Sequence, residues 1–180
     1  MPNRGRRLGD VGEIVESLRD LGLEPILVGG MALVLLGSQR VTRDFDFVVR
    51  HPGERLDAVV SLFYDRGFEL VSRLDEMGQV IATIDNRRVA SIQLRSDAPA
   101  SAFFFNPTTG LRVDLLFDFP VPAATLAEHA VRLTIESHAF HIASDEDLLM
   151  LKKIARRGRS APGDAEDIAF LEARHRRTTP

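Results

Sequence analysis

The sequence predicts an α+β protein with a mixed, twisted β-sheet backed by helices and a C-terminal helical extension. Three observations predict this class. Patterns typical of helices and of strands alternate in the first part of the chain, and hairpin patterns follow in the middle. Pro120 and Pro122 then mark a linker, beyond which helical patterns dominate. We therefore expect a core of residues 1–120 and an extension of residues 121–180 that packs on it.

The first part of the chain is expected to contain helices and strands in turn. Apolar residues spaced by three and four positions predict helices, and short apolar runs bounded by glycine or proline predict strands. The expected elements are a helix at Val11–Leu21 with Asp10 as its N-cap, a strand at Pro25–Val28, a short helix at Met31–Leu36, a strand at Asp44–Val49 and a helix at Glu54–Arg66.

The second part is expected to begin with hairpins and to end with helices. Turn residues separate short β-rich runs here, which is the pattern of a hairpin. The expected elements are strands at Gln79–Ile84 and Val89–Leu94 around a turn at Asp85-Asn86, a hairpin of Phe103–Phe105 and Leu111–Phe117, a strand at Ala139–Ile142, and helices at Asp145–Arg157 and Asp164–Arg174.

Composition excludes several classes of function. The chain contains no cysteine, so disulfides, thiolate metal sites and cysteine nucleophiles are excluded, and a cytoplasmic location is expected. The basic N-terminus leads into no apolar run, and the longest apolar stretch is too short to span a bilayer, so neither a signal peptide nor a membrane anchor is expected. The formal net charge is −3, which indicates no general affinity for polyanions. Basic residues nevertheless cluster at Arg4–Arg7, Lys152–Arg159 and Arg174–Arg177.

Asp44-Phe45-Asp46 opens an apolar strand pattern and is the first candidate for chemistry. Strand alternation puts both carboxylates on one face, with Cα atoms about 6.5–7 Å apart. Aspartate is disfavoured in strands, and two like charges on one face repel unless a cation lies between them. Carboxylate oxygens in this arrangement suit Mg²⁺, which retains sites for phosphate and water. The alternative is a solvated edge strand.

Asp114 is the second candidate, because it too interrupts an apolar strand pattern. If this strand lies beside the first one, Asp114 completes a cluster of three carboxylates with Asp44 and Asp46. Such a cluster can hold two cations about 3.5–4 Å apart, and Asp114 can accept a proton as a general base. Asp118 is expected on the same face but nearer the strand end, so it ranks second.

Gly29-Gly30 lies between an expected strand and an expected helix. Glycine lets backbone N–H groups approach a triphosphate closely, and a helix N-terminus favours anions. Many strand-to-helix turns use glycine for geometry alone, and that alternative stays open here.

Together, these motifs resemble the signature of the DNA polymerase β-type nucleotidyltransferase superfamily: Gly-Gly after an apolar strand, then Asp-x-Asp, then a third acid on a later strand. Val28–Ala32 and Arg40–Asp46 are similar to the small bacterial AbiEii-type toxin transferases and to the aminoglycoside and lincosamide nucleotidyltransferases. Lys152, followed by Asp164 and Asp167, resembles the pattern of a lysine on one helix and D-x-x-D on the next in the AbiEii-type proteins.

The resemblance implies a polymerase β-like fold and a role for each matching residue. Asp44, Asp46 and Asp114 would bind two Mg²⁺ ions, with Mn²⁺ as an alternative, and would be the catalytic residues. The nucleotide-binding residues would be Gly29, Gly30, Arg40, Thr42, Arg43 and Lys152. Lys152 could equally be a surface lysine that pairs with Asp167.

The leading hypothesis is therefore transfer of a nucleoside monophosphate from an NTP to RNA, such as tRNA, or to protein. The chain would then be the toxin of a pair with a cognate antitoxin protein. One alternative is a small-molecule enzyme of the aminoglycoside or lincosamide type. The other is a non-catalytic nucleotide-binding module.

Overall fold

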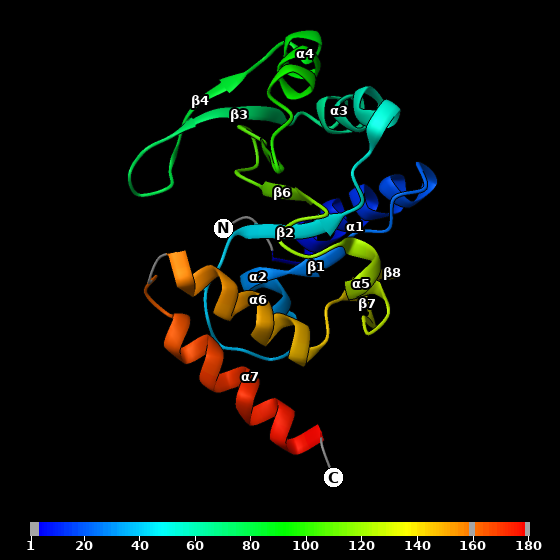
Figure 1. Ribbon diagram of the computed structural model, residues 1–180. Helices are drawn as coiled ribbons and strands as arrows, with labels where there is room; N and C mark the ends of the chain where they lie inside the picture. The colour runs from blue at the N-terminus through cyan, green and yellow to red at the C-terminus, as the bar shows by residue number, and fades with distance from the viewer. Residues whose placement is uncertain (1–3, 159–160, 179–180) are drawn as a thin grey trace.

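The computed structural model describes residues 4–158 and 161–178, with side chains from Arg7 onward in the first helix (Figure 1). The elements in chain order are α1 (Arg4–Asp20), β1 (Ile26–Val28), α2 (Gly29–Leu35), β2 (Asp44–Val49), η1 (Gly53–Arg55), α3 (Leu56–Tyr64), β3 (Glu69–Leu74), β4 (Val80–Ile84), α4 (Arg87–Asp97), β5 (Ser101–Phe105), β6 (Arg112–Phe117), α5 (Ala123–Ala127), β7 (Val131–Ile135), β8 (His138–Ile142), α6 (Asp145–Gly158) and α7 (Asp164–Thr178). Of the predicted basic clusters, the side chains of Arg4 and Arg6 and the whole of Arg159 lie outside the described residues.

One eight-stranded sheet runs through the molecule in the order β4-β3-β5-β6-β2-β1-β8-β7. β2 pairs with β6 in parallel and with β1 in the antiparallel sense, so the sheet is mixed. β8 pairs in parallel with β1, so the segment after the predicted linker adds two strands to the same sheet. The predicted α+β class with a mixed sheet is confirmed.

β2 and β6 lie at the centre of the sheet and have one apolar face. Phe45 and Phe47 of β2 are buried, as are Val113 and Leu115 of β6. Asp44, Asp46 and Asp114 alternate with these residues and are less completely buried. Period-two alternation thus places the apolar side chains in the core and leaves the carboxylates together on the opposite face.

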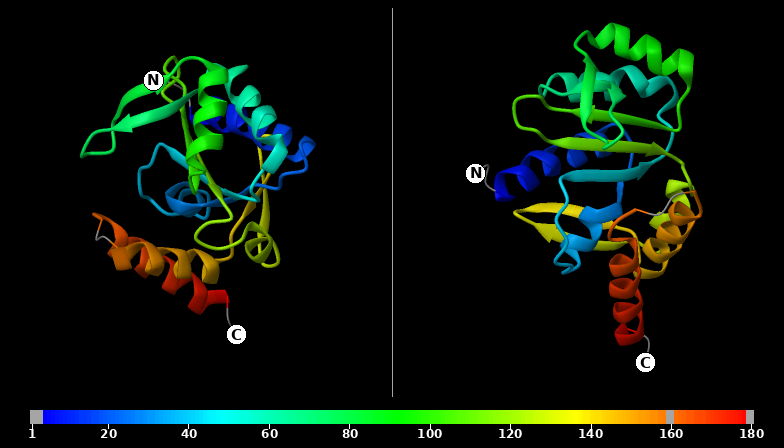
Figure 2. Two further views of the ribbon diagram at one scale, coloured as in Figure 1. Left: turned by 45° about the horizontal axis from the view of Figure 1, so that its top comes forward. Right: turned by 90° about the vertical axis from the view of Figure 1, so that its left-hand side faces the viewer.

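Two pairs of helices lie toward opposite ends of the molecule (Figures 1 and 2). α3 and α4 lie together at one end, and α6 and α7 lie together at the other, beyond α2. Arg174 of α7 donates a hydrogen bond to Asp145 of α6 at 3.2 Å, which joins these two helices. It also donates to the Leu36 carbonyl at 3.0 Å, which joins α7 to the end of α2. In the part of the chain that the structure describes, no helix has both the length and the apolar character needed to cross a membrane.

The prediction of a strand at Val89–Leu94 is wrong, because this segment lies within the helix α4. The side chain of Asn86, expected in a turn, accepts hydrogen bonds from the N–H groups of Arg88 (3.0 Å) and Val89 (3.1 Å) and caps the helix. Ala90 and Leu94 are the buried residues of α4, and their spacing of four is the helical period. The N-cap and this spacing outweigh the β-propensity of the valine and isoleucine in the segment.

Several boundaries also differ from the sequence prediction. α1 begins at Arg4, so Asp10 lies inside the helix and is not its N-cap. α2 begins directly at Gly29, two residues before the predicted start. α5 and β7 occupy a stretch after Pro122 for which no secondary structure was predicted.

Candidate active site

The three aspartates come from two neighbouring strands at the centre of the sheet. Asp46 of β2 lies directly opposite Asp114 of β6, and Asp44 lies opposite Arg112. The pairing is parallel and in register, so the side chains of Asp44, Asp46 and Asp114 project from one face. Residues distant in sequence thereby form one carboxylate cluster.

The cluster is electrostatically unfavourable for carboxylates without a cation. The pKa of Asp46 is raised from 3.8 to about 7, chiefly by burial and then by the negative charges of Asp114 and Asp44. The positive charges of Lys152 and Arg40 lower the pKa of Asp46 but do not outweigh these causes.

Asp114 shows the same effect to a smaller extent. Its pKa is raised from 3.8 to about 6, with burial again the largest cause and the charge of Asp44 contributing, while a hydrogen bond with the side chain of Ser101 opposes the shift. Two neighbouring carboxylates with raised pKa values thus favour either a shared proton or a bound cation.

Within the described part of the chain, two oxygens of the cluster lack a hydrogen-bond partner. Oδ1 of Asp44 and Oδ1 of Asp114 are buried and have no hydrogen-bond partner among the described residues. Buried oxygens of this kind are costly unless a ligand satisfies them. No group of three or more His, Cys, Asp or Glu side chains in residues 4–158 and 161–178 is arranged to hold an ion alone. Mg²⁺ needs no such cage, because it binds through one or two carboxylates together with water and phosphate oxygens.

The glycine turn lies against this cluster. Gly29 follows β1 as the first residue of α2 and has φ of +67°, a conformation that favours glycine. A Cβ at this position would collide with the carboxylate of Asp46. Gly30 follows, and a Cβ there would lie 2.9 Å from Cζ of Arg40. The two glycines therefore allow the α2 N-terminus, the Asp46 carboxylate and the Arg40 guanidinium to share one small space.

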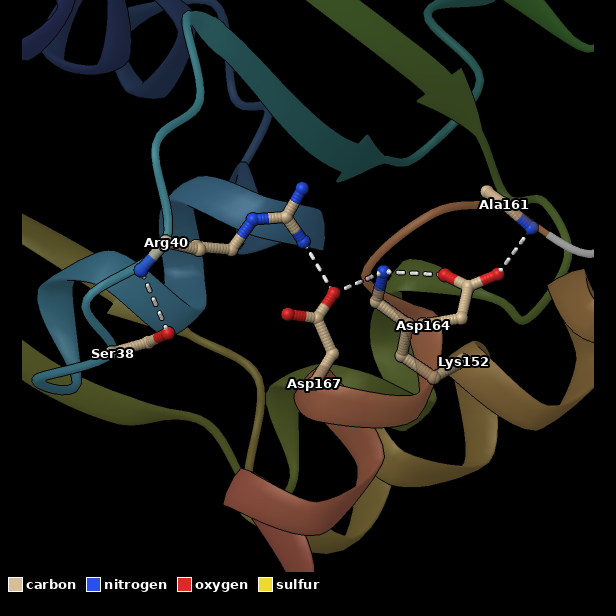
Figure 3. A network of polar contacts seen from close by, with 6 residues as sticks. All are labelled: Ser38, Arg40, Lys152, Ala161, Asp164 and Asp167. Atoms are coloured by element: carbon tan, nitrogen blue, oxygen red, sulfur yellow. Dashed lines mark hydrogen bonds and ion pairs between the residues drawn. The ribbon is translucent and has the colours of Figure 1, made fainter.

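Arg40 and Lys152 are joined through a buried carboxylate, as Figure 3 shows. Asp167 of α7 has a side chain only 4% exposed, and its Oδ2 accepts from Nη1 of Arg40 and lies 2.7 Å from Nζ of Lys152. Asp164 lies 3.3 Å from the same Nζ and accepts from the Ala161 N–H at 2.9 Å. The loop before β2, the helix α6 and the helix α7 thus meet beside the carboxylate cluster.

The remaining predicted residues lie in or near the same region. Thr42 is half-buried and Arg43 is exposed in the loop that leads into β2. Lys152 pairs with Asp167, as the surface-lysine alternative predicted. Its side chain is nevertheless only 18% exposed, and its positive charge lowers the pKa of Asp46, so it also lies near the carboxylates. Neither interpretation of Lys152 therefore excludes the other.

Asp118, the second-ranked candidate for the third acid, binds two backbone N–H groups with its carboxylate. It follows β6 with φ of +50°, and its carboxylate accepts from the N–H of His51 at 3.1 Å and of Ala123 at 3.0 Å. One oxygen therefore binds the segment after β2, and the other binds the first residue of α5.

Sequence reasoning assigned no role to Arg112 or Ser101, although both contact the cluster. Arg112 lies two residues before Asp114 and therefore on the same face of β6, which is a signal that the sequence does contain. Ser101 lies on β5, and its proximity to Asp114 depends on strand order, which the sequence does not state.

Comparisons with known proteins agree with this fold. No protein-family model matches the sequence, and no curated protein matches it either. Solved structures do match. The lincosamide antibiotic adenylyltransferase LnuA, solved with lincomycin bound, superposes with a TM-score of 0.57 at 14% identity over 91% of this chain and 95% of its own. The antibiotic-resistance factor ANT(2'')-Ia, solved in complex with adenylyl-2''-tobramycin, gives 0.57 at 13% identity over 92% and 87%.

A third match is a nucleotidyltransferase-like protein that is not described as an antibiotic-modifying enzyme. An antigenic nucleotidyltransferase-like protein from Paracoccidioides brasiliensis superposes with a TM-score of 0.57 at 18% identity over 92% of this chain and 74% of its own. The chain therefore has the polymerase β-like nucleotidyltransferase fold, as its motifs predicted.

Proposed function

We propose that this protein is a metal-dependent nucleotidyltransferase, which transfers a nucleoside monophosphate from an NTP to an acceptor and releases pyrophosphate. The observation that carries the proposal is the register of β2 and β6, which sets Asp46 beside Asp114 next to the Gly29 turn. In this proposal residues 1–120 form the transferase core, and residues 121–180 form the extension that supplies Lys152.

Asp44, Asp46 and Asp114 are the proposed cation ligands, in agreement with the buried oxygens of Asp44 and Asp114 that have no hydrogen-bond partner among the described residues. Two Mg²⁺ ions, or Mn²⁺ in their place, would lower the charge repulsion among phosphates and favour the deprotonated acceptor hydroxyl. Without a cation the three carboxylates repel one another, so binding of the NTP and of the cations should be coupled.

The transfer itself needs one bond to form and one to break. The acceptor oxygen bonds to the α-phosphorus, and the bond from that phosphorus to the oxygen bridging the α- and β-phosphates breaks. Pyrophosphate leaves with the bonding electrons, and the proton of the acceptor hydroxyl passes to Asp114.

The triphosphate would bind on the Gly29-Gly30 side of the carboxylates. The α2 N-terminus offers backbone N–H groups there, and Arg40 lies against Gly30. Lys152 supplies a second positive charge near Asp46. Thr42 and Arg43, in the same loop as Arg40, complete the proposed nucleotide-binding set.

RNA, such as tRNA, or protein is the leading acceptor class, with the chain as the toxin of a pair with an antitoxin protein. The motif of Lys152 followed by Asp164 and Asp167 supports this branch, because both aspartates contact Lys152 beside the carboxylates. The alternative is a small hydroxylated antibiotic. The match to LnuA over 95% of that chain supports the alternative.

A labelling experiment tests the reaction and separates the acceptors. The protein is incubated with each α-labelled NTP and Mg²⁺ or Mn²⁺, together with bulk RNA, lysate protein, or a panel of aminoglycosides and lincosamides. We expect label to pass to one of these preparations, and Asp46→Asn to abolish the transfer. Absence of transfer to every preparation, together with a melting temperature that NTP and Mg²⁺ leave unchanged, would contradict the proposal.

A further inference from the structure

Arg112 connects the carboxylate cluster to the β3–β4 hairpin. Its Nη1 lies 3.7 Å from Oδ1 of Asp44, which is an ion pair rather than a hydrogen bond. The same Nη1 donates to the Gly78 carbonyl at 3.3 Å, and Nη2 donates to Oε1 of Gln79 at 3.0 Å. The Arg112 side chain is only 17% exposed. One guanidinium thus contacts a candidate cation ligand and the turn of a hairpin more than thirty residues away in sequence.

The hairpin turn has a defined structure that Arg112 can hold. Asp75 Oδ1 accepts from the N–H groups of Met77 (2.9 Å) and Gln79 (2.7 Å), and Gly78 adopts φ of +75°. The base of the hairpin is fixed separately, since the Tyr64 hydroxyl lies between the Leu70 N–H and the Ile84 carbonyl.

Only the first two residues of β3 pair with β5, so the rest of the hairpin projects beyond the sheet (Figure 1). The register with β4 shifts between Val71 and Leu74, where a bulge bends the hairpin. The projecting part is therefore held at its base by Tyr64 and at its turn by Arg112.

The position of the hairpin relative to the glycine turn indicates which substrate it faces. Along the sheet, β1 with the Gly29 turn lies on one side of β2, and β6 with Arg112 lies on the other. In a phosphoryl-type displacement the attacking and leaving oxygens are roughly in line on opposite sides of the phosphorus. If pyrophosphate leaves on the Gly29 side, the acceptor arrives on the Arg112 side.

We propose that Arg112 is a positioning residue that fixes the β3–β4 hairpin to Asp44, and that this hairpin forms the acceptor-side wall of the active site. The proposal rests on the nucleotidyltransferase function proposed above. The hairpin carries exposed apolar side chains, since Met77 at its turn is 85% exposed and Leu74 and Ile81 are 43% and 50% exposed. In this proposal a hydroxyl-bearing acceptor passes the hairpin on its way to Asp114.

Limited trypsin digestion tests the connection without any substrate. Arg73 lies exposed in the hairpin, so cleavage after it reports how often the projecting part opens. We expect Arg112→Ala to raise the rate of cleavage after Arg73 about tenfold or more, and Gln79→Ala to raise it less. An unchanged rate in Arg112→Ala would overturn the inference that Arg112 holds the hairpin.

The labelling assay tests the acceptor role, with bulk RNA, lysate protein and the antibiotic panel as probes. We expect Arg112→Ala and Met77→Ser each to raise the half-saturating concentration of whichever preparation the wild type labels, by about tenfold or more for Arg112. In Met77→Ser the rise in melting temperature caused by NTP and Mg²⁺ should stay as in the wild type, because this substitution in the hairpin turn changes neither the carboxylates nor the Gly29 side.

Val131→Ser is the matched control for Met77→Ser, because Val131 is 53% exposed on β7 at the opposite edge of the sheet. Equal acceptor saturation in Met77→Ser, Arg112→Ala and the wild type would overturn the acceptor role of the hairpin alone. A wild type that transfers no label and gains no stability from NTP would instead overturn the proposed function, so the two failures are distinguishable.

Discussion

The two sides of the carboxylate cluster are held in different ways. On the Gly29 side, Arg40 and Lys152 share one buried carboxylate, that of Asp167. On the Arg112 side, the guanidinium donates hydrogen bonds to two neutral acceptors in an exposed turn, the Gly78 carbonyl and Gln79 Oε1. Its ion pair with Asp44 is long, at 3.7 Å. Ion pairs with a buried carboxylate fix geometry more firmly than hydrogen bonds from a guanidinium to neutral acceptors in an exposed turn. In the proposed reaction, the firmly held side would bind the phosphates and the more adaptable side would receive the acceptor.

Asp46 belongs to both sides, so its replacement should have the largest effect. Asp46→Asn keeps the shape of the side chain but removes a cation ligand, and we expect label transfer to fall by about 10²–10³-fold. The measurement is the initial rate of transfer at saturating Mg²⁺. Asp118→Asn is the control, because Asp118 holds a loop and should retain transfer. Equal loss in both variants would show that the effect is structural.

Replacement of Asp167 should break the Gly29 side alone. Asp167→Asn leaves Arg40 and Lys152 without their shared counter-charge, so we expect NTP affinity to fall about 10–100-fold, as with other orienting partners. We also expect stability to fall by about 1–3 kcal/mol. NTP binding is measured by titration, and stability by urea denaturation.

Asp145→Asn gives the comparison for Asp167→Asn, since it removes an ion pair between the same two helices, with Arg174. It should lower stability without a matching loss of NTP affinity. If both variants lose affinity equally, Asp167 acts only by holding α7 in place.

The close contact at the glycine turn should be the next most sensitive feature. Gly29→Ala introduces a Cβ that collides with the Asp46 carboxylate, and we expect transfer to fall about tenfold or more, in line with the loss of an orienting contact. Gly110→Ala is a matched control, because Gly110 has a similar φ of +72° but no atom within 4 Å of the added Cβ. Both variants should lose some stability through backbone strain, but only Gly29→Ala should lose activity.

The smallest expected effect is on the stability of the cation-free protein. The pKa of Asp46 is 3.8 in the unfolded chain and about 7 in the folded one, so the folded state binds more protons between these values. Stability must then fall as pH rises through this window and level off above it. Asp46→Asn lacks this loss, so in EDTA at pH 8 it should be more stable than the wild type by about 1 kcal/mol or more.

For a chain of this size, each kcal/mol of stability shifts the melting temperature by about 2–4 °C. Thermal melts of both proteins at pH 5 and pH 8 measure it. A gap between wild type and variant that does not widen with pH would mean that Asp46 is not destabilised by its neighbours.

Sequence predicted the central strands well because their burial is decided locally. The alternation of Asp44, Phe45 and Asp46, repeated around Asp114, fixes which side chains enter the core and which share the opposite face. The sequence does not show by itself that β2 and β6 are neighbours in the sheet. Their adjacency depends on strand order, so only the resemblance to a known superfamily suggested it.

The regions that sequence reasoning missed depend on capping or on distant contacts. α4 was read as a strand because the Asn86 cap and the Ala90–Leu94 spacing were not weighed against β-propensity. The contacts of Arg112 with the hairpin join segments whose proximity no local pattern states. The sequence indicated Asp167 as part of a motif and as a surface partner of Lys152, whereas its burial beside Arg40 and Lys152 emerges from the packing of α7.

Anomalous diffraction from crystals grown with Mn²⁺ and a non-hydrolysable NTP tests the central claim most directly. We predict Mn²⁺ peaks in contact with Asp44, Asp46 and Asp114, with the triphosphate against Gly29-Gly30. Ordered nucleotide elsewhere on the molecule, with no Mn²⁺ at these three carboxylates, would contradict the proposed reaction.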